Sequence, residues 1–171
     1  MSVTTRIGAL AGKIAARFDD RDRVFYAADM VAFTLRGGVW HVLVIRRGWN
    51  PGKGKLALPG GHVERGETSR AAAVRELAEE TGIRVRGGAS VDQLGVFDDP
   101  GRDARGRYVS VAYGVCLGDA PDPVAADDAA TAEWMPLHEA LRVADEGGFA
   151  FDHRLLLATG VCHYPMVRPA R

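Results

Sequence analysis

The sequence predicts a mixed α/β domain of the α+β kind, in which helices pack against one sheet. Segments rich in β-branched and aromatic residues alternate along the chain with segments rich in helix-forming residues. The 171 residues suffice for one domain with a sizeable core. No internal repeat, low-complexity tract or interdomain linker divides them. We therefore expect one domain over residues 23–171, preceded by a helix within residues 1–22.

Charge and composition disfavour several classes of partner. Lys and Arg together number 22, as do Asp and Glu, so no overall field attracts nucleic acid or an anionic membrane. No apolar run approaches the roughly 20 residues that a membrane helix needs, and the N-terminus lacks the apolar core of a signal peptide. Cys116 and Cys162 have no metal-ligand spacing. We expect a cytoplasmic protein that binds neither nucleic acid nor membrane.

The first predicted element is an amphipathic helix over residues 5–20, where apolar residues recur at helical spacing. Because few basic residues flank its apolar stripe, we expect it to pack on its own domain or on the partner subunit of a homodimer. Two strands follow, at residues 24–35 and 39–45, and the Gly37-Gly38 pair between them signals a tight turn. The second strand is continuously apolar, which predicts burial on both faces.

A short helix is predicted from Ser69 to Thr81. This stretch contains no Gly or Pro and is rich in Ala, Leu, Arg and Glu. Thr68 or Ser69 can cap its N-terminus, and Gly82 stands where a left-handed C-cap is expected.

The later elements follow the same patterns. Residues 108–117 alternate apolar side chains on one face, and Gly147-Gly148 separates two helix-like segments. Polar loops containing several Pro and Gly residues lie between the strands. The sequence thus predicts strands at residues 91–97, 108–117 and 129–137 and helices at residues 138–145 and 151–158.

The helix that begins at Ser69 carries an acidic face. Glu76, Glu79 and Glu80 fall within an arc of about 100°, and Ala72 and Ala73, one turn earlier, are expected to leave room above them. Carboxylates at this spacing repel each other unless a cation is present. Hard oxygen ligands suit Mg²⁺ or Mn²⁺, which proteins commonly share with substrate phosphates. A solvated acidic helix face is the alternative.

The spacing of the surrounding residues resembles a known motif. Gly61, Glu67, Arg75 and Gly82 stand with the acids in the pattern G-x5-E-x7-R-E-U-x-E-E-x-G-U, where U is bulky and apolar. On this match the chain is identified as a member of the Nudix family. The resemblance implies the family's α/β/α sandwich around a mixed β-sheet, here with an extra N-terminal helix.

The resemblance also implies roles for the motif residues. Glu76 and Glu80 are expected to be the principal ligands of Mg²⁺ or Mn²⁺, with Glu79 in support and the backbone carbonyl of Gly60 completing the set. Arg75 and Glu67 are expected to orient these carboxylates, although a purely structural ion pair is equally compatible. The general base stays open among Glu79 of the helix and two loop residues that can equally be ordinary turn residues. These loop candidates are Asp127 and Asp128.

Segments outside the motif resemble ADP-ribose hydrolases of the family and the related regulators of NAD metabolism. They are residues 99–113, residues 125–137 and the F-D-H string at 151–153, and Pro100 lies within about one residue of the position that marks these hydrolases. Basic and aromatic loop residues could contact phosphate, ribose or base, or could be solvated. These candidates are Arg46, Trp49, Arg102, Arg105 and Arg107.

The resemblance therefore implies metal-dependent hydrolysis of a pyrophosphate bond in a small nucleotide, with ADP-ribose giving AMP and ribose 5-phosphate. A housecleaning (d)NTP pyrophosphohydrolase is the first alternative, because the motif alone does not separate the two. A module that binds ADP-ribose or another NAD metabolite without cleaving it is the second.

Overall fold

The structure is a computed structural model, which describes residues 23–118, 120–126 and 129–167. The expected N-terminal helix and the candidate bases Asp127 and Asp128 lie outside the described residues. The elements are β1 (Val24–Arg36), β2 (Val39–Arg47), β3 (Leu56–Ala57), β4 (Gly60–His62), α2 (Ser69–Thr81), β5 (Val91–Phe97), β6 (Arg107–Leu117), β7 (Ala129–Pro136), α3 (Leu137–Asp145), α4 (His153–His163) and a 3₁₀ turn, Pro165–Val167.

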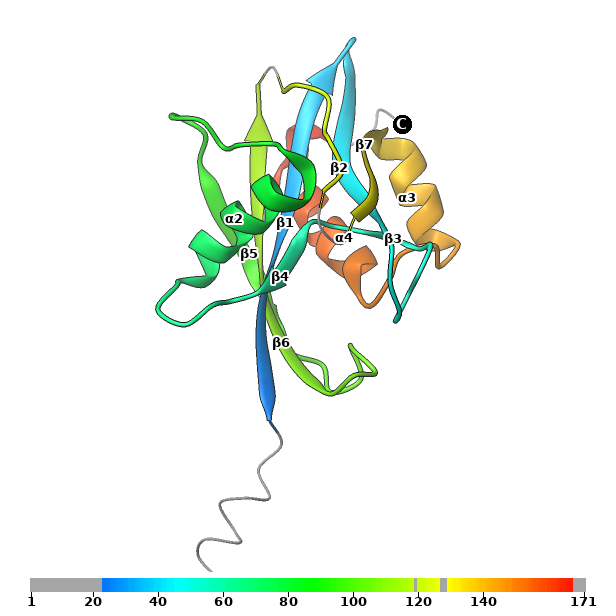
Figure 1. Ribbon diagram of the computed structural model, residues 1–171. Helices are drawn as coiled ribbons and strands as arrows, with labels where there is room; N and C mark the ends of the chain where they lie inside the picture. The colour runs from blue at the N-terminus through cyan, green and yellow to red at the C-terminus, as the bar shows by residue number, and fades with distance from the viewer. Residues whose placement is uncertain (1–22, 119, 127–128, 168–171) are drawn as a thin grey trace, which may run out of the picture.

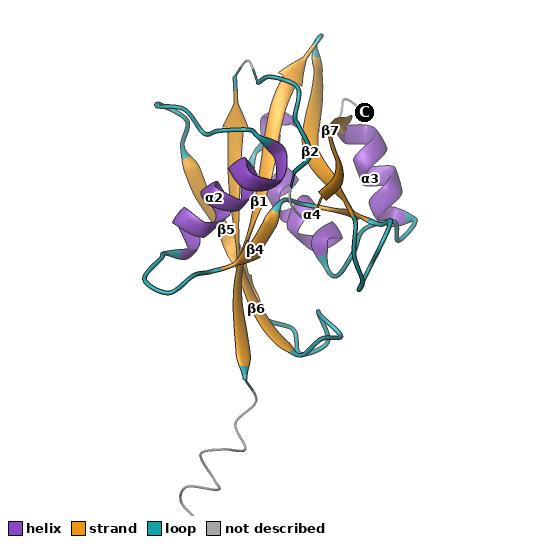
Figure 2. Ribbon diagram, viewed as in Figure 1, coloured by secondary structure: helices purple, strands orange, loops and turns teal. Residues whose placement is uncertain are grey.

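One mixed sheet of seven strands forms the centre of the fold (Figure 2). Its main path runs β3-β2-β1-β6-β5, while β4 pairs with β1 and β7 pairs with β2. The pairing of β1 with β6 is parallel, and the other pairings are antiparallel. The β1–β2 hairpin turns at Gly37 and Gly38, whose φ angles of 56° and 80° favour glycine.

Helices cover both faces of the sheet (Figure 1). Because side chains alternate along a strand, β1 supplies both cores: Met30 packs in the cluster that contains Leu77 of α2, and Phe33 packs in the cluster that contains Leu156 of α4. Helices α3 and α4 therefore form one outer layer and α2 the other. The expected α/β/α sandwich around a mixed sheet is confirmed.

Most element boundaries agree with the sequence patterns, and the differences have local causes. Helix α4 begins at His153, not at residue 151, because Phe151 has a φ of 52°, outside the helical region. Strands β3 and β4, which the sequence did not predict, are too short to show periodicity. Burial on both faces of β2 is limited to residues 42–45.

The buried face of α2 also differs from expectation. Ala72 and Ala73 pack against the sheet with Leu77 and are fully buried, so they do not lie open above the acids. Their small side chains instead let the helix approach the sheet closely. No helix within the described part of the chain has the length and apolar character needed to cross a membrane.

Neighbouring leucines of α4 test this packing. Leu156 is fully buried and Leu155 is 44% exposed. We expect Leu156→Ala to lower the free energy of unfolding by about 2–5 kcal/mol, because it leaves a cavity under the helix. Leu155→Ala, the matched control, should change it by only about 0.5 kcal/mol. Equal losses in urea unfolding would contradict the placement of α4.

Candidate active site

Helix α2 and the turn before it carry the site. The Thr68 hydroxyl accepts a hydrogen bond from the Ala71 N–H at 3.2 Å and so caps the N-terminus. At the other end Gly82 has a φ of 70° and donates its N–H to the carbonyl of Ala78 at 2.9 Å. Both caps agree with the sequence analysis, so the rotation of the acidic residues about the helix is well defined.

Arg75 is the centre of the polar network on this helix. Its guanidinium donates two parallel hydrogen bonds to Glu67, from Nε and Nη2, each 3.0 Å long. Nη1 also donates to Glu76 and to Glu79, both at 2.8 Å, and Nη2 donates to the carbonyl of His62 at 3.0 Å. The predicted Arg75–Glu67 contact is therefore present, and the same cation orients both glutamates. The hydrogen bond from Arg75 lowers the pKa of Glu67 and keeps it ionised.

Glycines at the start of the motif make room for two carboxyl groups. A Cβ atom on Gly61 would lie 2.3 Å from Oε1 of Glu76, and one on Gly60 would lie 2.2 Å from Oδ1 of Asp29. Neither approach is possible for a residue with a side chain. Strand β4 can therefore lie directly against the acids of α2 and β1 because positions 60 and 61 are glycine.

Glu80 is a buried carboxyl group, with 7% of its surface exposed. Its Oε2 atom accepts a hydrogen bond from the Gly60 N–H at 3.0 Å. Burial raises its pKa to about 8, and the nearby charges of Glu76 and Asp29 add to this rise against the Gly60 hydrogen bond. Burial also raises the pKa of Glu76. Both carboxyl groups would gain from a bound cation, which would favour their ionised forms.

The chemistry of these donors fits a hard divalent cation, although the side chains are not arranged as a finished coordination sphere. Among residues 23–118, 120–126 and 129–167, no three Asp, Glu, His or Cys side chains are grouped as metal ligands. The reason is visible in the geometry, since Glu76 and Glu79 turn toward Arg75. Glu80 and Gly60 already touch, and rotation of the Glu76 side chain would add a second carboxylate to them.

A cleft opens beside Glu80 and Gly60. It is bounded by β1, the loop after β2, the β5–β6 loop and the residues before α4, which lie far apart in sequence. Its polar and aromatic lining residues are Asp29, Arg47, Trp49, His62, Glu80, Arg102, Asp103, Arg105, Tyr108, Phe151 and His153. The cleft thus places acids on one side and arginine and aromatic groups on the other.

Two of the predicted substrate contacts face this cleft directly. Trp49 is 66% exposed at its rim. The Arg105 guanidinium lies 4.7 Å from the ring centre of Tyr108 and 5.2 Å from that of Phe151, and it also pairs with Asp103 at 2.6 Å. Their contact with substrate stays a prediction.

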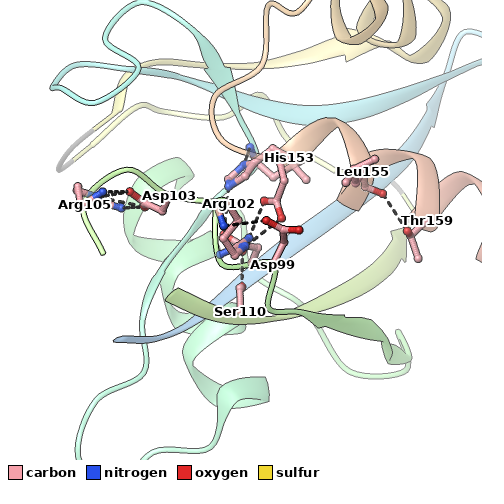
Figure 3. A network of polar contacts seen from close by, with 12 residues as sticks. Asp99, Arg102, Asp103, Arg105, Ser110, His153, Leu155 and Thr159 are labelled. Atoms are coloured by element: carbon pink, nitrogen blue, oxygen red, sulfur yellow. Dashed lines mark hydrogen bonds and ion pairs between the residues drawn. The ribbon is translucent and has the colours of Figure 1, made fainter. Parts of the chain in front are cut away.

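The other predicted arginines have partners within the chain. Arg102 lines the cleft but is only 5% exposed, and it forms an ion pair with Asp152. Figure 3 shows Arg102 within the network of polar contacts around this pair. Arg46 donates to the carbonyl of Gly54 at 2.8 Å, and Arg107 donates to the carbonyl of Asp98. A role in substrate binding for these three also stays a prediction.

Several lining residues were not singled out as site residues in the sequence, among them Asp29, Arg47, Phe151 and His153. Asp29 and His153 come together across 124 positions of the chain, so no local spacing marks them. The F-D-H string at 151–153 was the available signal, although only as part of a resemblance.

A family model of the NUDIX domain matches residues 25–157. The chain belongs to the Nudix family. An ADP-ribose pyrophosphatase of Methanocaldococcus jannaschii is 40% identical over 120 residues, which cover 68% of this chain and 63% of the relative. This Nudix chain therefore spans less than two thirds of that protein's length.

Solved structures of Nudix proteins have the same fold. The NUDIX domain of Shewanella oneidensis NrtR, in complex with ADP ribose, aligns with a TM-score of 0.72 and 25% identity over 87% of this chain and 97% of that one. A Francisella tularensis bifunctional NMN adenylyltransferase/ADP ribose pyrophosphatase, with AMP and a manganese ion, aligns with a TM-score of 0.67 and 26% identity over 94% of this chain and 47% of that one.

Removal of the Arg75 guanidinium tests whether it compensates the repulsion between Glu67, Glu76 and Glu79. We expect Arg75→Gln to lower the free energy of unfolding by about 1–3 kcal/mol, because three carboxylates lose a shared donor. The loss should shrink in high salt, which screens their repulsion. Arg142→Gln is the matched control, since Arg142 pairs with Glu146 on the exposed side of α3. A loss as small as that of the control would contradict the role of Arg75.

Proposed function

We propose that this chain hydrolyses the pyrophosphate bond of ADP-ribose, with release of AMP and ribose 5-phosphate. One observation carries the proposal: the hydrogen-bonded pair Glu80 and Gly60 lies in the wall of a cleft that is also lined by arginine and aromatic side chains. A diphosphate needs its negative charge neutralised, and its sugar and base need flat or hydrogen-bonding partners. The ADP-ribose pyrophosphatase relative and the ADP-ribose complex of the NrtR domain support this choice of substrate.

Glu76, Glu80 and the carbonyl of Gly60 would hold Mg²⁺ or Mn²⁺, with Glu79 in support. When bound, the cation would neutralise phosphate charge and acidify a coordinated water. The manganese ion in the Francisella structure supports this assignment. Arg75 would hold Glu79 in place, and Glu67 would fix Arg75 from the other side.

Hydrolysis requires a group that accepts the proton of the attacking water while the bridging P–O bond breaks. Glu79 is the described candidate, because its side chain is 47% exposed and a hydrogen bond from Arg75 directs it. Asp127 and Asp128 are the other candidates for this role. Arg105 and Trp49, which line the cleft, would bind the phosphate and the base.

A substrate panel tests the reaction. We expect the protein with Mg²⁺ or Mn²⁺ to release AMP and ribose 5-phosphate from ADP-ribose faster than it cleaves dGTP, ATP, NADH or dinucleoside polyphosphates. Preferred cleavage of a nucleoside triphosphate would identify a (d)NTP pyrophosphohydrolase instead. Tight binding of ADP-ribose without turnover would identify a sensing module.

Replacement of Glu80 separates a functional role from a structural one. Glu80→Gln should lower turnover by about 100-fold, because it removes a charged ligand. In the presence of a chelator it should leave the free energy of unfolding unchanged or higher, because the neutral amide avoids the cost of burying a charge. Glu139→Gln, on the exposed side of α3, is the control for both measurements. Unchanged turnover in Glu80→Gln would remove the basis of the metal assignment.

Replacement of Gly61 tests the close approach of β4 to Glu76. In Gly61→Ala the new methyl group fills the space beside the Glu76 carboxylate and restricts the positions that it can adopt, so we expect the affinity for Mn²⁺ to fall by about tenfold. Gly87→Ala is the control, because a Cβ atom at Gly87 meets nothing within 4 Å. Titration calorimetry measures both affinities, and equal values would count against Glu76 as a ligand.

A further inference from the structure

The residues directly before α4, Phe151 to His153, have three costly features in a row. Phe151 is the one non-glycine residue of the described chain with a positive φ, 52°. Asp152 stands at the N-cap position of α4, yet its side chain makes no capping hydrogen bond. It forms instead an ion pair in which Arg102 is 5% and Asp152 13% exposed. Strain, a missing cap and a buried ion pair each reduce stability, and such features gather at functional sites.

Asp152 ties the β5–β6 loop to α4. Its two carboxylate oxygens accept from Nε of Arg102 at 2.9 Å and from Nη2 at 2.7 Å. Two such parallel bonds fix the direction of the guanidinium as well as its distance. The same loop carries Asp103 and Arg105, and the Arg105 guanidinium faces the Phe151 ring across the cleft. The position of Arg105 therefore depends on a contact made by Asp152.

His153 contacts a different segment, the backbone at Leu58. Its Nδ1 atom accepts a hydrogen bond from the backbone N–H of Leu58 at 2.9 Å. Because Nδ1 accepts, the proton of the neutral ring is on Nε2, which lies 3.7 Å from Oδ1 of Asp29. Burial lowers the pKa of His153, in agreement with a neutral ring. Figure 3 shows His153 at the start of its helix, near the strand that carries Ser110.

Asp29 connects His153 to the Gly60 segment. One of its oxygens accepts from the Ser110 hydroxyl, and the other is the atom that a Cβ on Gly60 would meet. The N–H of the next residue on β1, Met30, donates to the carbonyl of Pro59 at 2.8 Å. The backbone from Leu58 to Gly60 is thus held from one side by His153 and from the other by β1.

We propose that Phe151–His153 is the positioning segment of this active site. Within it, Asp152 positions the substrate-binding β5–β6 loop and its Arg105, and His153 positions the Leu58–Gly60 backbone, whose Gly60 carbonyl is a metal ligand in the proposed function. The inference rests on that function. It predicts that changes at two adjacent residues affect different kinetic parameters, which a purely structural role would not produce.

Two substitutions at His153 separate its two contacts. The Oδ1 atom of Asn can occupy the place of Nδ1, so His153→Asn keeps an acceptor for Leu58. The amide nitrogen of Gln can occupy the place of Nε2. His153→Gln therefore keeps a contact with Asp29 and leaves the Leu58 N–H unpaired. We expect His153→Gln to lower kcat and Mn²⁺ affinity about tenfold, with KM little changed. His153→Asn should retain most of both.

A spectroscopic measurement checks the same arrangement without turnover. ¹⁵N NMR of histidine-labelled protein should show the signal of a neutral ring protonated at Nε2 that is absent from both His153 variants. A ring protonated at Nδ1 would overturn the Leu58 contact. Equal kcat and equal Mn²⁺ affinity in the two variants would overturn the positioning role.

Substitution of Asp152 tests whether this residue positions the β5–β6 loop. Asp152→Asn should raise KM for ADP-ribose by roughly tenfold or more while kcat changes little, because Arg105 loses its fixed position. Glu146→Gln is the matched control, since both oxygens of Glu146 also accept from an arginine, but Glu146 is the C-cap residue of α3, away from the cleft. Asp152→Glu keeps the charge beside Arg102, so it preserves a folded protein if the amide does not, and it should also raise KM.

The outcomes distinguish this inference from the proposed function. If the wild-type protein does not cleave ADP-ribose, the proposed function fails, and the comparisons are made with the panel substrate that it cleaves best. If the wild-type protein cleaves ADP-ribose and the Asp152 variants keep its KM, the positioning role of Asp152 is overturned alone. A parallel fall in kcat and rise in KM at both residues would overturn the assignment of separate roles to Asp152 and His153.

Discussion

The structure around the site depends on how the repulsion between neighbouring carboxylates is compensated. Arg75 donates hydrogen bonds to Glu67, Glu76 and Glu79, which holds an acid of the turn before α2 close to two acids of the helix. Glu80 is treated differently, because it is buried beside the Gly60 N–H and its pKa rises to about 8. A carboxyl group in that position is costly as an anion and becomes favourable only near a cation.

The fold converts this local arrangement into a cleft. Glycines at positions 60 and 61 let β4 approach α2 and β1, so that the acids meet the loops at one edge of the sheet. The parallel pairing of β1 with β6 brings the β5–β6 loop to the same edge. From there Arg105 faces the ring of Phe151. The acids belong to one continuous motif, whereas the opposite wall is assembled from segments that only the sheet topology brings together.

This difference explains what the sequence could and could not predict. The α2 helix and its caps follow from local spacing, whereas the Arg75–Glu67 contact was implied by the resemblance to the Nudix motif. Burial of Glu80 was not predicted, because helical periodicity gives direction but not depth. The contacts of Arg102 with Asp152 and of Leu58 with His153 join residues 50 and 95 positions apart. No spacing rule in a single sequence reports such pairs.

The central claim is that the acids of α2 exist to bind a cation that in turn binds a diphosphate. Its most direct test is anomalous diffraction from crystals of the protein grown with Mn²⁺ and a non-hydrolysable ADP-ribose analogue. The account predicts a manganese peak in contact with Glu76, Glu80 and the Gly60 carbonyl, with the diphosphate of the analogue on its other side. An analogue bound elsewhere, with Glu76 still turned to Arg75 and no manganese beside Glu80, would contradict it.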